Sequence, residues 1–529
     1  MLLAALIAGF PITHATGRGD GVVITDLTDD SRHVVPGGLF VCRGTVDERA
    51  AGFIEQAVSA GASAVLTQAL AEEAPPLSIS PGVVHLVADD GVTVDQRLAG
   101  RVAERFFGGP ASRLRLIGIT GTNGKTTTAT ITQHLLRTSG EVCGLLGTVH
   151  VDTGHAEGPR PAELTTPGAI DLSRLLAEMV HNGCTCAVME VSSHALHQGR
   201  ADHLRFAAAG FTNLTQDHLD YHGTMADYAD AKAILFDSLD ADATAVLNGD
   251  DPASKRMARG CKASTVITRV TDDPGVLDEF CSPGSGLAIA IATELSASHS
   301  RARFVGSWGE VEAVLPLVGP HNLANAIQAA ALAHAVTGVG DEQLRTALDR
   351  CPPVPGRLEP VGPRWPKTVS ESHRKHLPAV LVDYAHTPDA LENVCAALRP
   401  LIAEGGRLIV VFGCGGDRDR AKRPLMAKAA CRYADVVILT SDNPRTEDPQ
   451  QILDDAAAGF DGSTHTETHV EIDRAKAIGQ AIGFATPADT VLIAGKGHED
   501  YQILGTTKVH FDDREHAAAA MRERLQSQP

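Results

Sequence analysis

A glycine-rich turn between an apolar strand and a helix constrains this chain more than any other feature of its sequence. The turn reads Gly121-Thr122-Asn123-Gly124-Lys125-Thr126-Thr127 and directly follows the apolar residues 114–119. Backbone N–H groups at a helix N-terminus bind anions, and glycines let the chain approach phosphates closely. A lysine beside the turn neutralises phosphate charge, and the next hydroxyl can ligate magnesium. The segment therefore predicts an α/β domain that binds a nucleotide phosphate through a helix over residues 125–138.

Three strict nucleotide-binding motifs are incomplete or absent in this sequence. The strict phosphate loop places a glycine five positions before Gly124, where this chain has Ile119. A plain strand-to-helix turn with an incidental lysine is therefore the alternative interpretation. The guanine-reading Asn-Lys-x-Asp motif is absent, which disfavours a GTPase. The run 413–418 begins like a dinucleotide fingerprint, but Arg418 stands where the third glycine belongs, so we reject a nicotinamide cofactor.

Length and charge narrow the class of protein. At 529 residues the chain is too long for one hydrophobic core. Its composition, 43% apolar and 21% charged, is typical of soluble globular proteins. The net charge of −19 comes without a long basic block, which argues against nucleic acid or an anionic membrane as the main partner.

Cysteines and apolar runs indicate the compartment. The ten cysteines form no CxxC pair, so the sequence supports neither a zinc site nor a disulfide framework, and most should be core residues. Residues 1–10 are apolar but lack a basic start and a cleavage site, which favours a short first helix over a signal peptide. No later run reaches the roughly 18 apolar residues of a membrane span. We expect a cytoplasmic protein that does not insert into membranes.

Proline and glycine clusters divide the chain into three α/β segments. Gly108-Gly109-Pro110 ends the first segment, in which residues 39–41, 64–66 and 83–87 are expected strands. Further α/β alternation is expected to about residue 339. A proline-rich linker at 351–356 then opens the third segment. We expect domains at residues 1–110, 111–350 and 351–529.

The third segment has the pattern of a buried parallel sheet. Its continuous apolar runs at 379–383, 407–412, 436–440 and 490–494 alternate with helical stretches. Asp448 is expected to be the N-cap of one helix and Pro449 its first residue. The polar residues 363–376 are expected to form an exposed loop.

Three further side chains could complete a phosphate or metal site. Glu190 follows the apolar run 186–189, which places it at the end of a strand. His218 lies in a loop rich in Asp and His, and oxygen ligands with one imidazole would suit magnesium. Lys232 lies in the helical stretch 227–236. Taken alone, each has an ordinary interpretation, as part of a hydrogen-bonded loop or as a solvated lysine.

Together these motifs resemble the Mur ligase family. The resemblance spans all three segments in order. It implies three domains: a small α/β UDP-binding domain, a central P-loop-type ATPase domain with a parallel-rich sheet, and a C-terminal Rossmann-like domain. The motifs that carry it are Thr120–Thr127, Met189-Glu190-Val191-Ser192-Ser193-His194, Asp217-His218-Leu219-Asp220-Tyr221-His222-Gly223, Gly319-Pro320-His321-Asn322, Asn325-Ala326, Val354-Pro355-Gly356-Arg357, Asp383-Tyr384-Ala385-His386-Thr387-Pro388, residues 412–424, Asp442-Asn443-Pro444-Arg445 and Gly495-Lys496-Gly497-His498-Glu499.

The resemblance implies an ATP-dependent ligase of peptidoglycan synthesis. ATP would phosphorylate the side-chain carboxylate of D-glutamate in a UDP-N-acetylmuramoyl dipeptide. The amine of an incoming amino acid would then attack the acyl phosphate and form an amide. The step needs positioned phosphates, magnesium to offset negative charge, and exclusion of water. The implied cofactors are ATP and Mg²⁺, the implied partners are the dipeptide and the amino acid, and the chain is expected to act as a monomer.

The resemblance also assigns roles to residues. Catalytic roles go to Lys125, Glu190, His218 and Lys232, and the metal ligands are Thr126, Glu190, His218 and a carbamylated Lys232, because a bare ammonium would repel the metal. The nucleotide is held by Gly121, Thr122, Asn123, Gly124, Lys125, Thr126, Thr127, Asn322, Arg357 and Asp383. Ser31 matches a contact to the uridine, and the contacts to the sugar and the dipeptide are matched by Thr165, Thr166, Ser192, Gln198 and Arg200. Two departures are Leu164, where relatives often have asparagine, and residues 45–52, which fit the family poorly.

The third segment indicates which amino acid is added. Diaminopimelate differs from lysine by a second carboxylate, which a planar arginine fork recognises best. Arg445, with Asn443, lies after the run 436–440 at the carboxyl edge of the sheet, where such folds bind ligands. We therefore expect meso-diaminopimelate rather than lysine. The other expected contacts are Arg418, Asp442, Pro444, Gly495 and Glu499, the last for the distal ammonium. A ligase for another acceptor, a folylpolyglutamate synthetase and a catalytically silent relative remain the alternatives.

Overall fold

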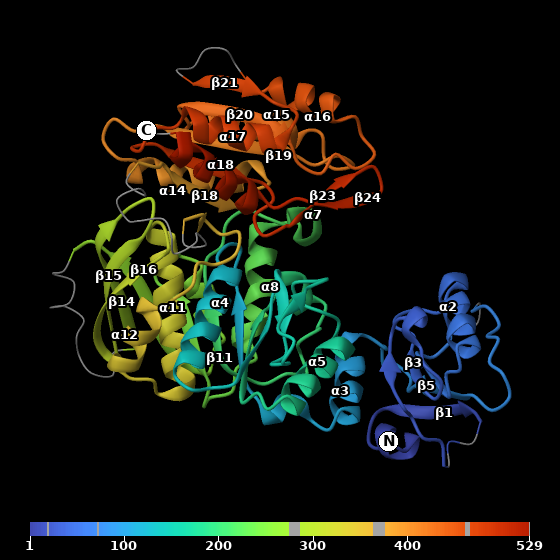
Figure 1. The fold of residues 1–529 in the computed structure, drawn as a ribbon. Helices are drawn as coiled ribbons and strands as arrows, with labels where there is room; N and C mark the ends of the chain where they lie inside the picture. The colour runs from blue at the N-terminus through green and yellow to red at the C-terminus, as the bar shows by residue number, and fades with distance from the viewer. Residues whose placement is uncertain are drawn as a thin grey trace. The chain divides into compact units, whose positions relative to one another are not determined.

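The computed structural model describes residues 1–17, 19, 21–70, 74–273, 286–362, 376–460 and 466–527. Helices alternate with parallel-rich sheets, which confirms the expected α/β class (Figure 1). The chain divides into two compact units, one formed mainly by residues 1–268 with 328–340, and the other mainly by residues 289–327 with 341–529. The finer division at residues 110 and 350 stays a proposal.

The first unit opens with a five-stranded sheet in the order β1-β5-β4-β3-β2, parallel except for β1. The three strands expected here are confirmed as β3, β4 and β5. The apolar start forms a short helix in which Leu3 and Leu6 are fully buried, as expected. The elements are α1 (Leu3–Ile7), β1 (Ile12–Thr16), β2 (Leu27–Thr28), η1 (Ser31–His33), β3 (Leu39–Val41), α2 (Glu48–Ser59), β4 (Ala64–Thr67), β5 (Val84–Ala88) and α3 (Gln96–Phe106).

A larger sheet follows in the same unit, with neighbouring strands in the order β13-β12-β11-β6-β10-β7-β8-β9. All these strands are parallel up to β7, and β8 and β9 add antiparallel pairs. The elements are η2 (Pro110–Arg113), β6 (Arg115–Thr120), α4 (Lys125–Thr138), β7 (Cys143–Leu146), β8 (His150–Asp152), β9 (Arg160–Pro161), α5 (Ala169–His181), β10 (Cys186–Glu190), α6 (Ser193–His197), β11 (Phe206–Phe211), α7 (Leu219–His222), α8 (Met225–Asp237), β12 (Thr244–Asn248), α9 (Ser254–Ala258) and β13 (Ser264–Thr271).

This sheet brings the expected site residues to one edge. β6 lies between β10 and β11, and its neighbours are parallel to it. Parallel strands end at the same edge of a sheet. The glycine turn after Thr120, the carboxylate of Glu190 and the loop after Phe211 therefore meet there.

The second unit begins with a feature that the sequence did not predict. Instead of continued α/β alternation, β14, β15 and β16 pair as an antiparallel meander. Buried apolar and more exposed residues alternate in β15 and β16, as in Arg301, Ala302, Arg303 and Phe304, which is the pattern of strands with one solvated face; in β14, residues 288–291 are all buried. The elements are β14 (Leu287–Leu295), β15 (Ser300–Gly306), β16 (Gly309–Leu315), α11 (Pro320–Thr337), whose last turns belong to the first unit, and α12 (Asp341–Asp349).

The rest of the second unit is the parallel sheet that the apolar runs predicted. Its order is β17-β18-β22-β19-β20-β21, and only β17 is antiparallel to its neighbour. Asp448 caps α16 and Pro449 begins it, as expected. The elements are β17 (Glu359–Pro360), β18 (Ala379–Asp383), α14 (Pro388–Leu398), η3 (Arg399–Leu401), β19 (Leu408–Cys414), α15 (Lys422–Cys431), β20 (Val436–Ser441), α16 (Pro449–Ala457), β21 (Glu467–Val470), α17 (Arg474–Phe484), β22 (Thr490–Ala494), β23 (Tyr501–Leu504), β24 (Thr507–His510) and α18 (Asp513–Ser527).

Both faces of this sheet are covered. Val410 and Phe412 of β19 pack into a core with residues of α14, α15 and α16. Ile409 and Val411 point to the opposite face and pack with residues of α17 and α18. A strand buried on both faces reads as a continuous apolar run, which explains why these strands could be predicted. The expected loop at 363–376 falls outside the described residues, apart from His376.

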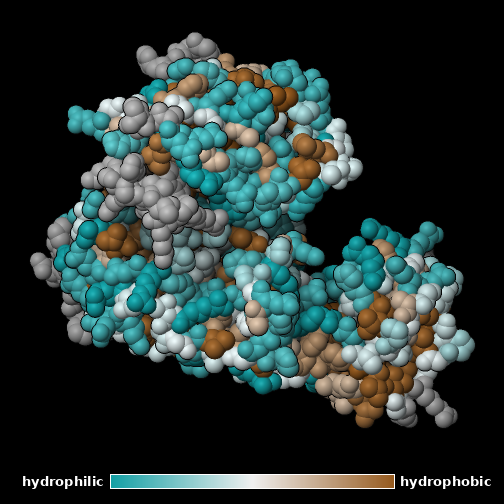
Figure 2. All heavy atoms as spheres, in the orientation of Figure 1, coloured by the Kyte–Doolittle hydropathy of each residue, from teal (hydrophilic) through white to brown (hydrophobic). Residues whose placement is uncertain are grey.

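Three further expectations from the composition concern apolar surface, membrane-crossing helices and the state of the cysteines. Apolar residues lie in separate patches on the face drawn in Figure 2. Within the described ranges, no helix combines the length and apolar content that a membrane crossing requires. Nine of the ten cysteines fall in described residues; all nine are free thiols and eight are buried, as expected of core residues.

Candidate active site

The glycine turn has the backbone that a phosphate loop requires. Gly121 has φ +147°, and a Cβ there would lie 1.9 Å from the Thr212 hydroxyl oxygen. Gly124 has φ +84° and is the N-cap of α4, so only glycine fits either position without strain. Ile119 is a fully buried residue of β6 whose neighbours are Glu190 and Gly210. The departure from the strict motif therefore has a structural reason: at Ile119 the chain is still inside the sheet.

Side chains from the neighbouring strand ends brace the turn. The amide N–H of Asn123 donates to the side-chain oxygen of Asn213 (2.9 Å), and the Thr122 hydroxyl donates to the carbonyl of Thr215 (3.2 Å). The Lys125 ammonium lies over the turn and donates to the carbonyls of Gly121 (3.0 Å) and Thr122 (2.9 Å). The turn is thus held in place by the loop after β11, and the Lys125 ammonium is bound to its carbonyls.

A buried carboxylate lies beside this turn. Glu190 is 1% exposed and accepts a hydrogen bond from the Thr126 hydroxyl (3.1 Å). It also accepts the backbone N–H (2.8 Å) and the hydroxyl (3.0 Å) of Thr148. A carboxylate and two hydroxyls of this kind are the hard oxygen donors that magnesium prefers. The structure therefore joins two of the four predicted metal ligands, Thr126 and Glu190.

Lys232 is buried rather than solvated. It is 1% exposed, and its ammonium donates to the carbonyl of Gly121 (2.8 Å) and lies 4.3 Å from the centre of the Tyr228 ring. Burial, and then the nearby Lys125 ammonium, lower the pKa of Lys232 well below its usual range. Burial also raises the pKa of Tyr228 to about 12. The solvated-lysine interpretation is therefore wrong, and Lys232 lies directly under the phosphate turn.

His218 has a different environment from the other predicted ligands. Its side chain is half exposed (48%) and lies 3.5 Å from the carboxylate of Asp217, with its ring packed 4.8 Å from that of His194. It is the N-cap of α7 and has φ +53°, a conformation uncommon outside glycine. In the part of the chain that the structure describes, no group of three or more His, Cys, Asp or Glu residues could hold a metal ion. The predicted set contains only two residues of those types, Glu190 and His218.

The predicted sugar and dipeptide residues lie in one hydrogen-bond network. The hydroxyl of Thr166 donates to the carbonyl of Glu190 (2.9 Å) and accepts the N–H of Ser192 (3.0 Å). Thr165 lies 3.1 Å from Thr148, hydroxyl to hydroxyl, and Thr148 in turn contacts Glu190. The network therefore reaches the phosphate turn through Glu190.

Arg200 extends this network. Its guanidinium donates to the carbonyl of Thr166 (2.8 Å) and to the side-chain oxygen of Gln198 (2.7 Å and 3.0 Å). Gln198 donates onward to the hydroxyl of Tyr221 (3.2 Å). Leu164, the departure from the family pattern, is exposed (56%). The five predicted dipeptide contacts therefore lie together, although Leu164 supplies no polar group.

Ser31 comes from η1, which follows β2 of the five-stranded sheet. It is 5% exposed in η1, and its hydroxyl donates to the side-chain oxygen of Gln56 (2.8 Å). The poorly matching residues 45–52 contain the start of α2, whose N-cap is Asp47. Neither observation tests the uridine contact, which stays a prediction.

The predicted nucleotide residues of the second unit come from two places. Asp383 ends β18 and accepts the N–H groups of Leu358 and Ala385, both at 2.8 Å. Burial raises the pKa of Asp383, and the Arg357 guanidinium opposes that shift. Arg357 lies 4.9 Å from the centre of the Tyr384 ring. Asn322 is buried in the first turn of α11 and donates to the carbonyl of Val318 (2.9 Å).

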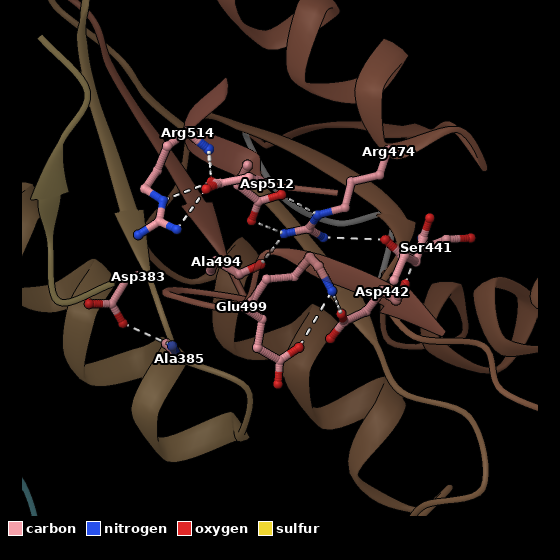
Figure 3. Close-up of polar contacts among 12 residues, drawn as sticks. Asp383, Ala385, Ser441, Asp442, Arg474, Ala494, Glu499, Asp512 and Arg514 are labelled. Carbon is pink, nitrogen blue, oxygen red and sulfur yellow. Dashed lines mark hydrogen bonds and ion pairs between the residues drawn. The ribbon is translucent and has the colours of Figure 1, made fainter. Parts of the chain in front are cut away.

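The predicted amino-acid residues gather at the carboxyl edge of the second unit's parallel sheet. Asp442, Asn443 and Pro444 follow β20 and are buried, whereas Gly495 and Glu499 follow β22. The side-chain amide of Asn443 donates to the carboxylate of Glu499 (3.0 Å). Asp442 and Glu499, labelled in Figure 3, come from the loops after β20 and β22, and both carboxylates form ion pairs with Lys496 (3.3 Å and 3.5 Å). The structure therefore brings both motifs together.

The two predicted arginines lie in neighbouring loops. Arg445 has φ +52°, is half-buried, and donates to the carbonyl of Gly416 (2.7 Å). Its backbone N–H donates to the carbonyl of Ile503 (3.0 Å), which ties the loop to β23. Arg418 is exposed. Both side chains approach Gly415 in the loop after β19, because a Cβ there would lie 3.0 Å from Nη1 of Arg445 and 3.7 Å from Cγ of Arg418.

Sequence reasoning missed two residues of these networks. Thr148 bridges Glu190 and Thr165, but no motif contains it. Lys496 is fully buried between Asp442, Asn443 and Glu499. It lies in the motif 495–499, in which only Gly495 and Glu499 were expected to contact the amino acid. A lysine between two glycines at the end of an apolar strand was the available signal.

The sequence and the fold of this chain are similar to those of known ligases. The description "Mur ligase middle domain" matches residues 119–333, and "Mur ligase, glutamate ligase domain" matches residues 368–497. A UDP-N-acetylmuramoyl-L-alanyl-D-glutamate–2,6-diaminopimelate ligase of Synechococcus elongatus is 46% identical over 532 residues, 99% of each chain. A solved structure of a ligase with the same name is 31% identical, with a TM-score of 0.62 over 95% of both chains. A MurF ligase from Thermotoga maritima in complex with ADP shares the fold, with 14% identity and a TM-score of 0.57 over 95% of this chain and 98% of that one.

Proposed function

Because this chain belongs to the Mur ligase family, we propose that it joins 2,6-diaminopimelate to UDP-N-acetylmuramoyl-L-alanyl-D-glutamate with consumption of ATP. The product is an amide on the side-chain carboxylate of D-glutamate, and ATP leaves as ADP and phosphate. The full-length similarity to ligases of that name supports the substrates. The observation that carries the proposal is the buried carboxylate of Glu190, which contacts both Thr126 of the phosphate turn and the network of dipeptide residues through Thr148.

The first half-reaction takes place in the first unit. The dipeptide carboxylate attacks the γ-phosphorus of ATP, the bond to ADP breaks, and an acyl phosphate forms. The backbone N–H groups of residues 121–127 and the Lys125 ammonium hold the phosphates and stabilise the charge that moves onto them. Arg200 and Thr166 hold the dipeptide, and Ser192 lies beside them.

Magnesium would be held at the phosphate turn. Bound Mg²⁺ offsets the negative charge of the phosphates and of the developing acyl phosphate. The hydroxyl of Thr126 and the carboxylate of Glu190, 3.1 Å apart, fit an oxygen-coordinated ion. His218 would approach from its loop as a further ligand.

Carbamylation of Lys232 would add an oxygen ligand for a second ion. A carbamate forms when a neutral amine attacks CO₂ and loses a proton. Burial lowers the pKa of Lys232 and so increases the share of its neutral amine. The modification exchanges a buried cation for a buried anion beside Lys125, which is favourable for binding a metal there.

The second half-reaction needs the amino-acid residues of the second unit. The amine of diaminopimelate attacks the acyl carbon, the C–O bond to phosphate breaks, and the amine loses a proton. Arg445, Asn443 and Arg418 bind the distal carboxylate, which arginine recognises through two parallel hydrogen bonds. Glu499 binds the distal ammonium and Gly495 offers its backbone. Asp442 and Pro444 shape the same loop.

Nucleotide contacts from the second unit complete the site. Asn322, Arg357 and Asp383 would bind the nucleoside part of ATP, so catalysis would require the two units to close over the substrates. The division at residues 1–110, 111–350 and 351–529, with Ser31 as a uridine contact, belongs to this proposal. So do a cytoplasmic location and a monomeric state.

Phosphate release tests the function. Purified protein with Mg²⁺, ATP and the UDP-muramoyl dipeptide should release phosphate only after diaminopimelate is added. Equal or faster release with L-lysine would refute the choice of amino acid. No release with either amino acid, although both substrates bind, would favour the catalytically silent relative.

A further inference from the structure

Lys496 is a buried cation inside the proposed amino-acid site, and none of the substrate contacts proposed above involves it. Lys496 follows β22 and is 0% exposed. Gly495 and Gly497, on either side of it, have φ +115° and +54°, and a Cβ on Gly497 would lie 2.7 Å from the Cβ of Tyr384. The backbone therefore needs glycine on both sides of Lys496, and this places the lysine side chain inside the protein.

Three acceptors surround the ammonium of Lys496. Its Nζ lies 3.2 Å from Asn443 Oδ1, 3.3 Å from Asp442 Oδ1 and 3.5 Å from Glu499 Oε2. An ammonium has three N–H donors, so each donor has one acceptor here. Both carboxylates, Asp442 and Glu499, are labelled in Figure 3, and each forms an ion pair with Lys496. Lys496 thus joins the loop after β20 to the loop after β22.

These contacts fix the orientation of Asn443. Its Oδ1 accepts from Lys496 and from the backbone N–H of Ile503 (3.0 Å), and its Nδ2 donates to Glu499 (3.0 Å). A flipped amide would turn its N–H groups toward the Lys496 ammonium and toward the N–H of Ile503. Lys496 and the N–H of Ile503 therefore together determine which atom of Asn443 faces Glu499.

Charge gives Lys496 a second effect. Asp442 and Glu499 are two carboxylates that contact the same cation, so the three groups together carry one negative charge. Without the cation, the carboxylates would repel each other in a buried place, and Glu499 would turn toward solvent. Another buried cation, Arg474, already pairs with Asp513 (2.7 Å) and donates to the carbonyls of Ser441 and Ala494 (Figure 3).

We infer that Lys496 is a positioning residue for the amino-acid substrate. It holds Asn443 and Glu499 so that their side chains recognise the distal carboxylate and ammonium of diaminopimelate, and it does not touch the reacting atoms. This inference rests on the proposed function. It predicts that loss of Lys496 weakens the use of diaminopimelate and leaves the ATP and dipeptide sites intact.

The test is a steady-state comparison of Lys496→Met with the unaltered protein. Methionine has a similar length and no charge. The KM for diaminopimelate should rise by at least roughly 10-fold, as for a buried charge pair that loses one partner. The KM values for ATP and for the dipeptide should stay within about 2-fold. Lys476→Met is the matched control, because that lysine is 70% exposed on α17 of the same unit, and it should change none of the three.

Chemical rescue separates positioning from structure. Lys496→Ala should regain a low KM for diaminopimelate when ethylammonium is added, whereas ethanol at the same concentration should not restore it. This variant, measured with ethylammonium, replaces Lys496→Met if the methionine variant does not fold. Equal increases in all three KM values, or rescue by ethanol, would overturn the inference.

The two possible failures are distinguishable. If the unaltered protein releases no phosphate with diaminopimelate, the proposed function fails. If the unaltered protein turns over and Lys496→Met keeps its KM for diaminopimelate, only the inference about Lys496 fails.

Discussion

Replacing Glu190 by glutamine removes one charge from the proposed metal site and leaves its shape intact. A glutamine oxygen can accept the N–H of Thr148, and its NH₂ group can donate to the hydroxyls of Thr148 and Thr126. The carboxylate now accepts three hydrogen bonds of 2.8, 3.0 and 3.1 Å. Each loses about 1 kcal/mol when its acceptor becomes neutral, or about 3 kcal/mol together. The neutral glutamine avoids the desolvation penalty of a buried carboxylate, and this raises the free energy of unfolding by several kcal/mol.

These opposing contributions leave the free energy of unfolding changed by less than about 2 kcal/mol. Activity should respond far more, because a charged group at the phosphates contributes about 100-fold to catalysis. The assays are urea unfolding followed by circular dichroism, and phosphate release as a function of Mg²⁺ concentration. Glu157→Gln, at an exposed position of the same unit, should behave like the unaltered protein. Glu190→Gln with activity within 3-fold of the unaltered protein would refute the role of Glu190.

Three other predictions follow from the first unit. Lys232→Ala should lose activity and regain part of it with added short carboxylates; indifference to the substitution would remove Lys232 from the site. Gly121→Ala should weaken ATP binding by at least roughly 10-fold in an equilibrium binding measurement, because its Cβ would collide with Thr212. Gly140→Ala is the control: that glycine also has a positive φ, +100°, but open space around the Cβ, so the affinity for ATP should not change. Burial lowers the pKa of His203 from 6.5 to about 4, so the unfolded chain takes up the proton first. The contribution of neutral His203 to the free energy of unfolding is complete above pH 6.5 and falls by about 3 kcal/mol as the pH drops to about 4. Urea unfolding of His203→Gln over this pH range should show a correspondingly smaller loss of free energy of unfolding.

Local signals predicted the phosphate turn and its flanking elements. The helix expected at 125–138 is α4, and the strand expected at 114–119 is β6, shifted by one residue. A turn that needs glycines with positive φ, and a helix that ends just before Gly140, are determined by short stretches of sequence. One sequence is therefore enough to predict them. The departure at Ile119 could be explained only once its place inside the sheet was known.

The parallel sheet of the second unit was predictable for a related reason. Two of its expected strands coincide with β18 and β22, and two others, β19 and β20, differ at their ends by one or two residues. Strands buried on both faces are continuous apolar runs, which stand out in a sequence. The meander β14–β16 was missed. Its strands β15 and β16 have one solvated face and give a weaker signal, and the short apolar run of β14 does not by its periodicity distinguish a strand from a buried helical segment.

Contacts between distant residues could not be predicted. The hydroxyl of Thr148 meets Glu190 across 42 positions, and the ammonium of Lys496 meets Asn443 across 53. Such pairs depend on strand order in the folded sheet, which single-residue patterns do not contain. The burial of Lys232 is of the same kind, because its helix packs under the turn at Gly121.

Competition between two amino acids tests the central claim most directly. The protein is supplied with Mg²⁺, ATP, the UDP-muramoyl dipeptide, and equal concentrations of meso-diaminopimelate and L-lysine, and the product is identified by mass spectrometry. The account predicts a UDP-muramoyl tripeptide that contains diaminopimelate almost exclusively, formed one-to-one with phosphate. A product that contains mainly lysine, or phosphate release without any tripeptide, would contradict it.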